Sequence, residues 1–534
     1  MLRGVVPPVN SLGPKALSAL QQISSPKALS VTVSRGAGQG DGRRPDWLCG
    51  YRLRRGRVCI LRPTGGFDLA TDSTLGSRPL SAGGARCTWG AGRIATAVLI
   101  EGGRAPPARA DTRPSPASRR KEEFVKVLVL GCGAVGTVSA LKFAQEPSCE
   151  QLVVADAVPG RARQLADRIG RPNVVALTLN AGDQQAVARA LRETRSTILL
   201  NAALPATNLI VMRACLDAGA DYIDMASGGA ENDGTPKLPD QFALDAEFRA
   251  AGRLALLGMG ADPGTSNVYA AYAAKHLLDE VTELRVRDGD TSVCAGHSGF
   301  LATFSPWVFI DECTCGAVSW RDGAYHLEEA LTGYEPFNFP ELGVLNTYYV
   351  DHEEARTLPM FFPGVRVADF KLCLDETTWS TLKVLKDLGL NRKDKVRVGD
   401  VEVSPRDLVV SLLPEPRDLA GRMSGKTCVG TLARGIRDGQ ERAYYIYNVT
   451  SQEHSYREMG VQATAYQTGI PPVIAARLIA SGEWAGSGVL SPEQLDPDPF
   501  MRLLDESGMP WHIRDEETGI VDPAYIWIEE PLAA

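Results

Sequence analysis

The sequence predicts an α/β protein with a doubly wound parallel sheet, followed by a second domain of the α+β type. Three observations carry this prediction. A branched apolar run meets a glycine-rich turn and then a helical pattern over residues 125–143. Strand-like and helical runs alternate from there to residue 257, which is typical of a parallel sheet covered by helices. Beyond residue 265 this alternation stops, and irregular, aromatic-rich sequence with strand-like pieces follows.

A glycine-rich turn opens the predicted fold. The strand at residues 125–130 runs into G-C-G-A-V-G at residues 131–136, a G-x-G-x-x-G pattern followed by a helical run. Gly131 permits the tight turn, Gly133 lets the backbone approach a pyrophosphate, and Gly136 lets the helix lie close to its strand. A strand, this turn and a helix in that order predict a Rossmann-type dinucleotide-binding domain.

Other residues of the dinucleotide site are expected where the chain leaves neighbouring strands. The first N–H groups of the helix, at Ala134 and Val135, face the phosphates at the positive end of the helix dipole. The second strand ends in Asp156, about 20 residues beyond the last glycine, where an acid accepts a hydrogen bond from a ribose 2′-hydroxyl. Because parallel strands end in one crevice, Asn201 and Ala202 are placed on the nicotinamide side.

The cofactor is therefore expected to be NAD or NADP. The Asp156 carboxylate accepts from a 2′-hydroxyl and repels a 2′-phosphate, which favours NAD. Arg161 and Arg163 follow directly and are able to accommodate a phosphate instead.

The remaining elements of the first domain, residues 121–264, follow from the same alternation. Strands are predicted at residues 151–156, 173–179, 197–201, 222–224 and 254–257, which makes six with the first one. Helices are predicted between them at residues 160–169, 183–193, 207–218 and 239–251. Glycines at positions 219 and 252 end the last two helices.

The second domain is predicted over residues 265–460, as an α+β unit that shapes a substrate pocket or a dimer surface. A helix is expected at residues 267–276, and strands at residues 283–288, 316–319, 347–350, 365–373 and 441–450. A C-terminal helical segment, residues 461–534, is expected to pack back on the first domain. Its main helix starts at Pro471-Pro472, because prolines are tolerated in a first helical turn.

Length and composition limit the class of protein. At 534 residues the chain is too long for a single core and predicts two or three units. Hydrophobic residues make up 44% and charged residues 23%, and no apolar run approaches the roughly 18 residues of a membrane span. The 11 cysteines include no C-x-x-C pair and the six histidines are scattered. We therefore expect free thiols, a reducing compartment and no bound metal.

The first 120 residues differ in kind from the rest. They carry 19 Lys and Arg against 6 Asp and Glu, although the whole chain has a formal net charge of −7. Gly, Pro, Ser and Arg dominate, and neither a helical nor a strand period is sustained. We expect a disordered or wrongly included basic extension. A transit peptide with a short helix at residues 14–23 and a nucleic-acid-binding arm are the alternatives.

From residue 121 onward the chain resembles the saccharopine dehydrogenase family, in particular its glutamate-forming reductases and their relatives, including carboxynorspermidine dehydrogenase. The resemblance rests on V-L-G-C-G-A-V-G (129–136), G-M-G-A-D-P-G-T-S-N (258–267) and F-S-P-W (304–307). The tail adds Y-Q-T-G-I-P (466–471) and S-P-E-Q-L-D-P (491–497). The Asp-Pro-Gly turn with this tail is much more specific than the glycine-rich turn, which many oxidoreductases share.

The resemblance implies an NAD(P)-dependent oxidoreductase acting on the C–N bond of a secondary amine, such as the amino-acid conjugate saccharopine. An aldehyde and an amine condense to an imine, which a hydride then reduces. Carboxynorspermidine or an opine-like conjugate is the alternative substrate. The polyamine branch is expected to carry an Asp-His pair shortly after Tyr447-Asn448, and this chain lacks it. A non-catalytic dinucleotide sensor is the alternative from another class.

Three residues are predicted to be catalytic. Asp262 matches the aspartate of the family's Asp-Pro-Gly turn, so it orients the substrate amine or relays a proton; capping of the next helix is the structural alternative. Asp224, at the end of a strand, invites the same two interpretations. His297 is the third, because a histidine can act as an acid or base near neutral pH.

The resemblance also places residues 287–297 on a substrate-facing strand and loop, so Arg287, Asp288 and Cys294 are predicted to contact substrate. Arginine forks suit a substrate with carboxylates. The expected partner is a small amino-acid substrate, without nucleic acid or membrane, and a homodimer is plausible. The expected location is the cytoplasm, or the mitochondrion if residues 1–120 include a transit peptide.

Overall fold

The computed structural model describes residues 30–34, 48–53, 57–61, 67–70, 125–228, 237–297 and 299–516. The chain divides into two compact units, Met1–Arg113 and Pro114–Ala534. The described part of the first unit is a four-stranded antiparallel sheet in sequential order, made of β1 (Ser30–Ser34), β2 (Leu48–Leu53), β3 (Arg57–Leu61) and β4 (Phe67–Ala70).

These four strands differ from the expectation that residues 1–120 have no regular structure. Each is a short run with valine, isoleucine, leucine or phenylalanine, residues that favour strands, although no run is long enough to show a clear period. The rest of residues 1–120, including the expected helix at 14–23, lies outside the described residues.

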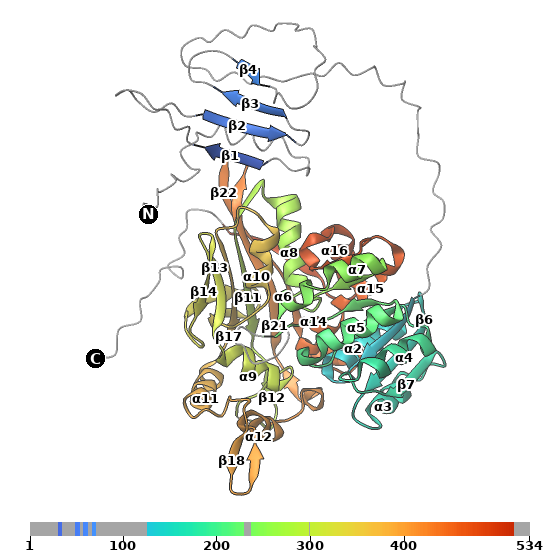
Figure 1. Cartoon of the computed structure of the whole chain (residues 1–534). Coiled ribbons are helices and arrows are strands. Elements are labelled where there is room, and N and C mark those ends of the chain that lie inside the picture. The colour runs from blue at the N-terminus through green and yellow to red at the C-terminus, as the bar shows by residue number, and fades with distance from the viewer. Residues whose placement is uncertain are drawn as a thin grey trace, which may run out of the picture. The chain divides into compact units, whose positions relative to one another are not determined.

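A seven-stranded, fully parallel sheet forms the first half of the second unit (Figure 1). Its order is β23-β10-β9-β8-β5-β6-β7, with β5 next to the point where the strand order reverses. The strands are β5 (Val125–Leu130), β6 (Cys149–Asp156), β7 (Val174–Thr178), β8 (Ile198–Asn201), β9 (Asp221–Ile223), β10 (Leu254–Leu256) and β23 (Gly488–Leu490). The six predicted strands are present, and the seventh, β23, comes from the C-terminal segment.

Helices cover this sheet on both faces. They are α2 (Ala134–Gln145), α3 (Arg161–Ile169), α4 (Gln184–Thr194), α5 (Asn208–Ala218), α6 (Leu238–Phe242) and α7 (Asp245–Ala251). The last two replace the single helix predicted at residues 239–251. The break precedes Asp245, whose carboxylate accepts a hydrogen bond from Val489 N at 2.9 Å and so ties α7 to β23.

A nine-stranded mixed sheet forms the other half of the unit. Its main order is β14-β13-β17-β11-β21-β22-β24, and β16 joins β17 and carries β15. The strands are β11 (Glu280–Asp290), β13 (Ala317–Arg321), β14 (Ala324–Glu328), β15 (Glu335–Phe339), β16 (Gly343–Tyr349), β17 (Val367–Cys373), β21 (Lys426–Arg437), β22 (Gln440–Ser451) and β24 (Trp511–Glu516). Its helices are α8 (Thr265–Tyr272), α9 (Pro306–Thr314), α10 (Glu354–Phe361), α11 (Glu376–Asp387) and α12 (Pro405–Ser411).

The C-terminal segment joins the two sheets. α13 (Gln452–Met459) precedes it, and its own helices are α14 (Ala463–Gly469), α15 (Pro471–Ser481) and α16 (Pro497–Glu506). α14 packs against α2, where Ser139 Oγ donates to Gly469 O at 2.8 Å. This segment was expected to be helical, but it also contains two strands: β23 in the first sheet and β24 in the second. Residues 517–534 lie outside the described residues.

The central strand β5 is buried on both faces, which makes it a rigid base for the turn that follows. Val127 and Val129 belong to one hydrophobic cluster, and Leu128 and Leu130 to another on the opposite face. The first cluster continues into the second sheet through Leu284. The two halves therefore share one core, which holds the space between them in a defined shape.

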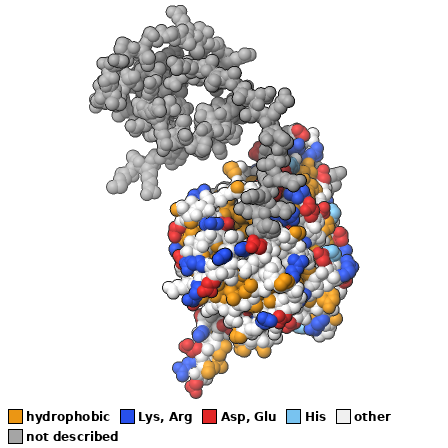
Figure 2. Space-filling view, turned by 90° about the vertical axis from the view of Figure 1, so that its right-hand side faces the viewer, with side chains coloured by type: hydrophobic (Ala, Val, Ile, Leu, Met, Phe, Trp, Pro, Cys, Tyr) orange, Lys and Arg blue, Asp and Glu red, His pale blue; other side chains and the backbone are white. Residues whose placement is uncertain are grey.

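No helix in the described part of the chain is long and apolar enough to cross a membrane. On the face shown in Figure 2, acidic and basic side chains are interspersed, with hydrophobic side chains between them.

Candidate active site

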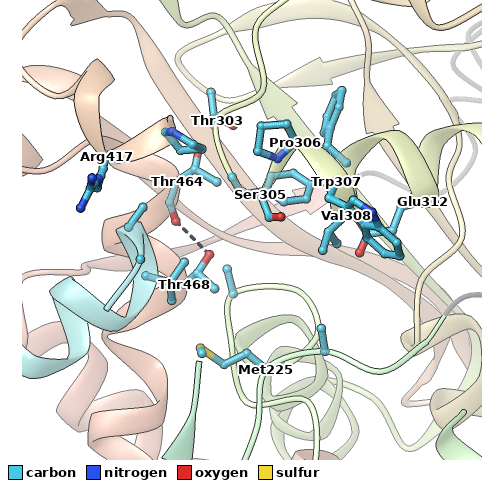
Figure 3. Close-up of a pocket in the computed structure, with 18 of the residues that line it drawn as sticks. Met225, Thr303, Ser305, Pro306, Trp307, Val308, Glu312, Arg417, Thr464 and Thr468 are labelled. Atoms are coloured by element: carbon cyan, nitrogen blue, oxygen red, sulfur yellow. Dashed lines mark hydrogen bonds between the residues drawn. The ribbon is translucent and has the colours of Figure 1, made fainter. Parts of the chain in front are cut away.

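A cavity of about 990 Å³ lies where the two sheets meet. One side is formed by the C-terminal ends of β5, β6 and β8, and the other by the ends of β11 and β17 and the start of β21. Figure 3 shows part of its lining, with Trp307 and Glu312 on one wall and Thr464 and Thr468 of α14 on another. Open parallel sheets bind ligands at this end of their strands, so the cavity is the candidate active site.

The glycine-rich turn has the geometry of a phosphate cradle. Gly131 has φ +105°, and a Cβ there would lie 2.5 Å from Ala202 O. A Cβ on Gly136 would lie 1.9 Å from Gly131 O, so only glycine lets α2 approach the strand this closely. A Cβ on Gly133 would meet nothing within 4 Å, and no side chain caps the first turn of α2. This N-terminus, with Ala134 and Val135 lining the cavity, fits a pyrophosphate.

Asp156 lies at the cavity and braces this turn. Its Oδ2 accepts from Cys132 N at 2.8 Å, and its Oδ1 accepts from Val158 N at 2.7 Å. Arg161 Nη1 lies 4.0 Å from Oδ2. The carboxylate is therefore bound to the backbone and screened by a guanidinium, which weakens the repulsion of a 2′-phosphate on which the preference for NAD rests.

Asn201 and Ala202 line the cavity beside the turn, and their contact with the nicotinamide side of a cofactor stays a prediction. Asn201 Nδ2 donates to Asn208 Oδ1 at 3.0 Å, and its Oδ1 accepts from Ala203 N at 3.2 Å. These bonds tie the end of β8 to the residues that follow it, so Asn201 positions this wall of the cavity.

Asp224 is not among the residues that line the cavity, in contrast to its prediction as a catalytic residue. Its Oδ1 accepts from Gly258 N at 2.7 Å. Its Oδ2 accepts from Tyr222 OH at 2.9 Å and from Gln241 Nε2 at 2.7 Å. Burial raises the pKa of Asp224 to about 7. Its hydrogen bonds tie β9 to the turn after β10, which is a structural role.

Asp262 and Asp288 meet at the centre of the cavity wall. Asp262 comes from the turn after β10 and Asp288 from the end of β11, and their carboxyl groups are hydrogen-bonded to each other. Burial, followed by the charge of Asp288, raises the pKa of Asp262 well above its usual range. Burial raises the pKa of Asp288 to about 7. The pair therefore holds a shared proton near neutral pH, with Asp262 as the donor.

A buried histidine stands beside this pair, and sequence reasoning missed it. His352 lines the cavity, its ring stacks on Phe370 with centroids 3.8 Å apart, and its Nδ1 donates to Glu354 Oε2 at 3.0 Å. Burial alone lowers the pKa of His352, but Glu354 and then Glu312 raise it well above its ordinary value. The run D-H-E-E at residues 351–354, directly after a strand, was the available signal.

The same cluster contains three side chains that are able to hold a metal ion. Ligand atoms of His352, Glu353 and Glu354 lie within 4.8 Å of one another. Glu353 Oε1 also accepts from Ser227 N. These contacts join the three side chains to one another and to the backbone, so the cluster forms an ion-paired network without a metal. The expectation that the site binds no metal stays a prediction.

Charge is unevenly distributed along the cavity. The half facing the second sheet is lined by Asp262, Asp288, Asp290, Glu312 and Asp375. Among the described lining residues, Arg161 and Arg417 are the arginines and there is no lysine. Arg161 lies at the cofactor end, and Arg417 lies at the opposite end of Figure 3 from Glu312.

Arg287 does not line the cavity, so its prediction as a substrate-binding residue is not supported by its position. Its side chain is fully buried, with Nη1 2.6 Å from Asp369 Oδ1 and Nη2 3.0 Å from Glu335 Oε2. Lys371 also pairs with Glu335, at 2.7 Å. This network lies within the second sheet. Sequence periodicity could not distinguish its residues from residues that line the cavity, because both kinds lie on β11 and the strands next to it.

His297 and Cys294 both line the cavity, on the loop after β11. His297 Nε2 lies 3.0 Å from Phe300 O, and the side chain is exposed at the rim. Cys294 is buried where the short strand β12 (Val293–Cys294) pairs with β20 (Met423–Ser424).

Two further polar groups face the cavity from α14 and were not predicted as site residues. Gln467 Nε2 and Thr464 Oγ1 are buried and have no hydrogen-bond partner among the described residues. Gln467 Oε1 accepts from Thr427 Oγ1 at 2.6 Å, which leaves the buried amide NH2 group without an acceptor. Both residues belong to the tail region whose motif carried the family resemblance.

Fold and site together define an NAD(P)-dependent oxidoreductase: a Rossmann sheet with a phosphate cradle, closed by a second domain with titratable groups. A family model described as the saccharopine dehydrogenase NADP binding domain matches residues 127–256. A second, described as the saccharopine dehydrogenase C-terminal domain, matches residues 260–509. The chain belongs to the saccharopine dehydrogenase family.

Curated relatives extend this finding. The carboxyaminopropylagmatine dehydrogenase of Synechocystis sp. is 34% identical, over 73% of this chain and 97% of the relative. The carboxynorspermidine synthase of Vibrio alginolyticus is 32% identical, over 74% and 98%. Their names match the alternative substrate class of the sequence analysis, although the chain lacks the expected Asp-His pair.

Among solved structures, the glutamate-forming saccharopine dehydrogenase of Saccharomyces cerevisiae is similar in fold. The TM-score is 0.56 at 16% identity, covering 74% of this chain and all of that chain (100%). This similarity shows the two-domain fold and carries no argument about substrate.

Proposed function

We propose that this protein is a reductase that joins an amino-acid semialdehyde to a cationic amine through a new secondary C–N bond, or cleaves that bond in reverse. The conjugate then has three parts: a carboxylate and amine at one end, the secondary amine, and a cationic tail. The names of the two curated relatives describe products of this kind. Saccharopine, a conjugate rich in carboxylates, is the second candidate.

The acidic half of the cavity is the observation that carries this proposal. Five carboxyl groups line it, and Arg287 is buried in the second sheet. The arginines that line the cavity are Arg161, at the cofactor end, and Arg417, at the opposite end of Figure 3 from Glu312. Ammonium and guanidinium groups favour such a wall, because carboxyl groups accept their hydrogen bonds and a nearby cation favours the ionised form of each acid. A substrate with three carboxylates would meet repulsion there.

The carboxylate end of the substrate also has a place. Gln467 Nε2 and Thr464 Oγ1 are buried donors without a partner, so a substrate carboxylate supplies the acceptors that they lack. Trp307 and Phe370 contribute apolar surface that excludes water around the reacting atoms.

The Asp262–Asp288 pair supplies the proton chemistry. The Asp288 carboxylate takes a proton from the attacking ammonium group, and the free amine adds to the aldehyde carbon. The Asp262 carboxyl group gives its proton to the departing hydroxyl, so water leaves and a C=N bond forms. One proton enters the pair and one leaves, and its charge is unchanged.

When bound, the nicotinamide supplies the hydride that reduces this bond, or removes it in the oxidative direction. The chain's own contribution at that point is electrostatic. The monoanionic Asp262–Asp288 pair stabilises the positive charge on the imine nitrogen, and the protonated His352 beside it limits the total negative charge of the cluster.

A substrate panel tests the proposal. The full-length protein is given NADPH or NADH with aspartate semialdehyde plus 1,3-diaminopropane or agmatine, and with 2-aminoadipate semialdehyde plus glutamate. We expect oxidation of the cofactor with a cationic amine and little with glutamate. Turnover with glutamate alone would replace this proposal by saccharopine. Binding of the cofactor without turnover for any pair would favour the sensor function.

We also propose a homodimer in a reducing compartment such as the cytoplasm. Eight free cysteines among the described residues support the reducing compartment. The edge strand β14 supports self-association, because Tyr325 and Leu327 there are 49% and 72% exposed. Light scattering on the wild type and on Leu327→Asp tests the dimer. We expect the mass of a dimer for the wild type and a lower mass for the variant. A wild type with the mass of a monomer would exclude the dimer.

A further inference from the structure

Asp290 is an acid of the cavity wall that takes no part in the proton chemistry of Asp262 and Asp288. It ends β11, two residues beyond Asp288, and the pairing of β11 with β21 is regular there. Both side chains therefore leave the same face of the strand, from Cα atoms about 6–7 Å apart. Two nitrogen atoms of one substrate, joined by a short carbon chain, are able to reach one carboxyl group each.

The Asp290 carboxyl group lacks a partner of opposite charge. Its Oδ1 accepts from Ser292 N at 2.6 Å, and the described Lys, Arg and His side chains form no ion pair with it. Burial raises the pKa of Asp290 to about 6, so the group is mostly ionised at neutral pH. A carboxylate shielded from water in this way gains from a bound ammonium group, which supplies the missing charge.

Two hydrogen-bond donors of α14 lie next to Asp290 on the same side of the cavity. Thr427 is the residue that faces Asp290 across β11 and β21, and its Oγ1 donates to Gln467 Oε1 at 2.6 Å. Gln467 is only 1% exposed, and its Nε2 has no acceptor in the described part of the chain. The same holds for Oγ1 of Thr464, one helical turn earlier. These donors need an acceptor from a ligand.

We propose that Asp290, Gln467 and Thr464 form a subsite for the α-amino-acid group of the semialdehyde. Asp290 binds its ammonium group, and the two donors of α14 bind its carboxylate. The subsite rests on the proposed function and deepens it, because the two ends of the conjugate then lie on different walls. Glu312 stands on another wall than Thr464, so that wall is left to the cationic tail (Figure 3).

Three small analogues of the semialdehyde test the subsite by binding alone. L-Homoserine keeps both charged groups and carries an alcohol in place of the aldehyde. 4-Hydroxybutyrate lacks the ammonium group, and 3-aminopropan-1-ol lacks the carboxylate. Each is titrated by ligand-observed NMR against the full-length protein saturated with NADPH or NADH. We expect L-homoserine to bind at least about tenfold more tightly than either analogue, because only it satisfies the acid and the donors together.

Variants assign the two charges to residues. Asp290→Asn is expected to raise the Kd for L-homoserine about tenfold without weakening 4-hydroxybutyrate, because it removes a charge that repels a lone carboxylate. Gln467→Leu is expected to weaken both of these ligands and to leave 3-aminopropan-1-ol within about twofold. Asp290→Glu keeps the charge and should fall between Asp290→Asn and wild type. Glu280→Gln is the control, because Glu280 lies on β11 and is exposed outside the cavity.

A role of Asp290 in shaping the wall would have a different signature. Asp290→Asn would then weaken L-homoserine and 4-hydroxybutyrate alike, which would overturn the proposal. Equal affinity of the wild type for these two ligands, or no saturable binding of L-homoserine, would also overturn it. Thermal melting shows whether each variant is folded.

Steady-state kinetics separate this inference from the proposed function. Asp290→Asn should raise the KM for aspartate semialdehyde about tenfold and leave the KM for the amine within about twofold. Binding of L-homoserine that depends on Asp290, without turnover of any substrate pair, contradicts only the proposed function. Turnover with a cationic amine and a wild-type KM for the semialdehyde in Asp290→Asn contradicts only this inference.

Discussion

At the scale of single residues, the surroundings of a buried acid decide whether it has a catalytic or a structural role, even where the acids look alike in sequence. Asp224, Asp262 and Asp288 all follow or end predicted strands. Asp224 accepts hydrogen bonds from the backbone and from neutral side chains, so it holds the fold. Asp262 and Asp288 instead meet each other at the cavity, and this contact produces a carboxyl pair with a shared proton.

Asp288→Asn tests the role of this pair. Asp288 has its pKa raised to about 7, and it works as a base only when ionised, so wild-type kcat/KM should rise with pH through about 7. The variant should lose about 10²-fold or more in kcat and lose this limb of the profile. Rates from about pH 5 to about pH 9, with NADPH affinity measured alongside, check both effects.

Asp279→Asn is the control for this variant, since Asp279 is exposed just before the same strand and pairs with Arg437. It should retain the wild-type rate and profile. Asp262→Asn should also lose turnover, because it removes the proton donor. If a variant at either position kept the wild-type kcat, the contact between Asp262 and Asp288 would be structural and not catalytic.

At the scale of elements, the turn between β5 and α2 combines two kinds of glycine. Gly136 is required by packing, because a Cβ there would lie 1.9 Å from Gly131 O. Gly133 is not required by packing, because a Cβ there would meet open space and its backbone has φ −72°, which any residue adopts. Its lack of a side chain therefore serves the ligand, and the two positions should respond differently to alanine.

Gly133→Ala should leave the melting temperature within about 2 °C of wild type and weaken NADPH binding about tenfold or more, because its methyl group occupies the space of the pyrophosphate. Gly136→Ala should lower the free energy of unfolding by about 1–3 kcal/mol, since the backbone has to move. Urea unfolding without ligand and fluorescence titration with NADPH measure these effects. Unchanged NADPH binding in Gly133→Ala would contradict the role of Gly133 in holding the pyrophosphate. Wild-type stability in Gly136→Ala would contradict the packing role of Gly136.

At the scale of the whole molecule, the C-terminal segment contributes one strand to each of the two large sheets. β23 adds to the Rossmann sheet and β24 to the mixed sheet, and α14, which precedes both strands, packs on α2. A single hydrophobic cluster continues from Val127 to Leu284 across the two halves. The cavity is therefore enclosed by one body, in which acids are buried both at the cavity and, as with Asp224, within one half.

Burial of these acids makes the stability of the whole molecule depend on pH. Burial raises the pKa of Asp224 and Asp288 to about 7 and that of Asp290 to about 6, against 3.8 unfolded. The stability that their protonated forms contribute is complete below the unfolded pKa and is lost as pH rises through the folded values. The melting temperature should therefore fall by at least about 2 °C between about pH 5 and about pH 8.

Asp224→Asn provides the check on this prediction. Removing one titrating group should reduce the dependence on pH. Stability at low pH should also fall, because an amide donor then faces the donors Gly258 N and Gln241 Nε2. Melting curves across the pH range measure both quantities, and a variant with the wild-type pH slope would contradict the assignment to Asp224.

Much of the first domain could be predicted because its signals are local. The run at residues 125–143 contains a complete strand, turn and helix, and each later strand begins within two or three residues of its predicted position. The single helix predicted at residues 239–251 was wrong, because the segment is divided into α6 and α7. The division precedes Asp245, whose carboxylate accepts a hydrogen bond from Val489 N, more than 240 residues away. The strands β23 and β24 were missed because short segments are identified only by the sheets that they join.

The sequence by itself determined the Rossmann fold, the phosphate cradle and the family, because these depend on neighbouring residues and on the order of motifs. Only the tertiary structure decided which charged residues do chemistry. Arg287 and Asp288 are adjacent in sequence and alternate across one strand, so one enters a buried ion-pair network and the other meets Asp262 at the cavity. Likewise, Arg417 and Arg161 line one cavity only because two domains close on each other, which no local pattern records.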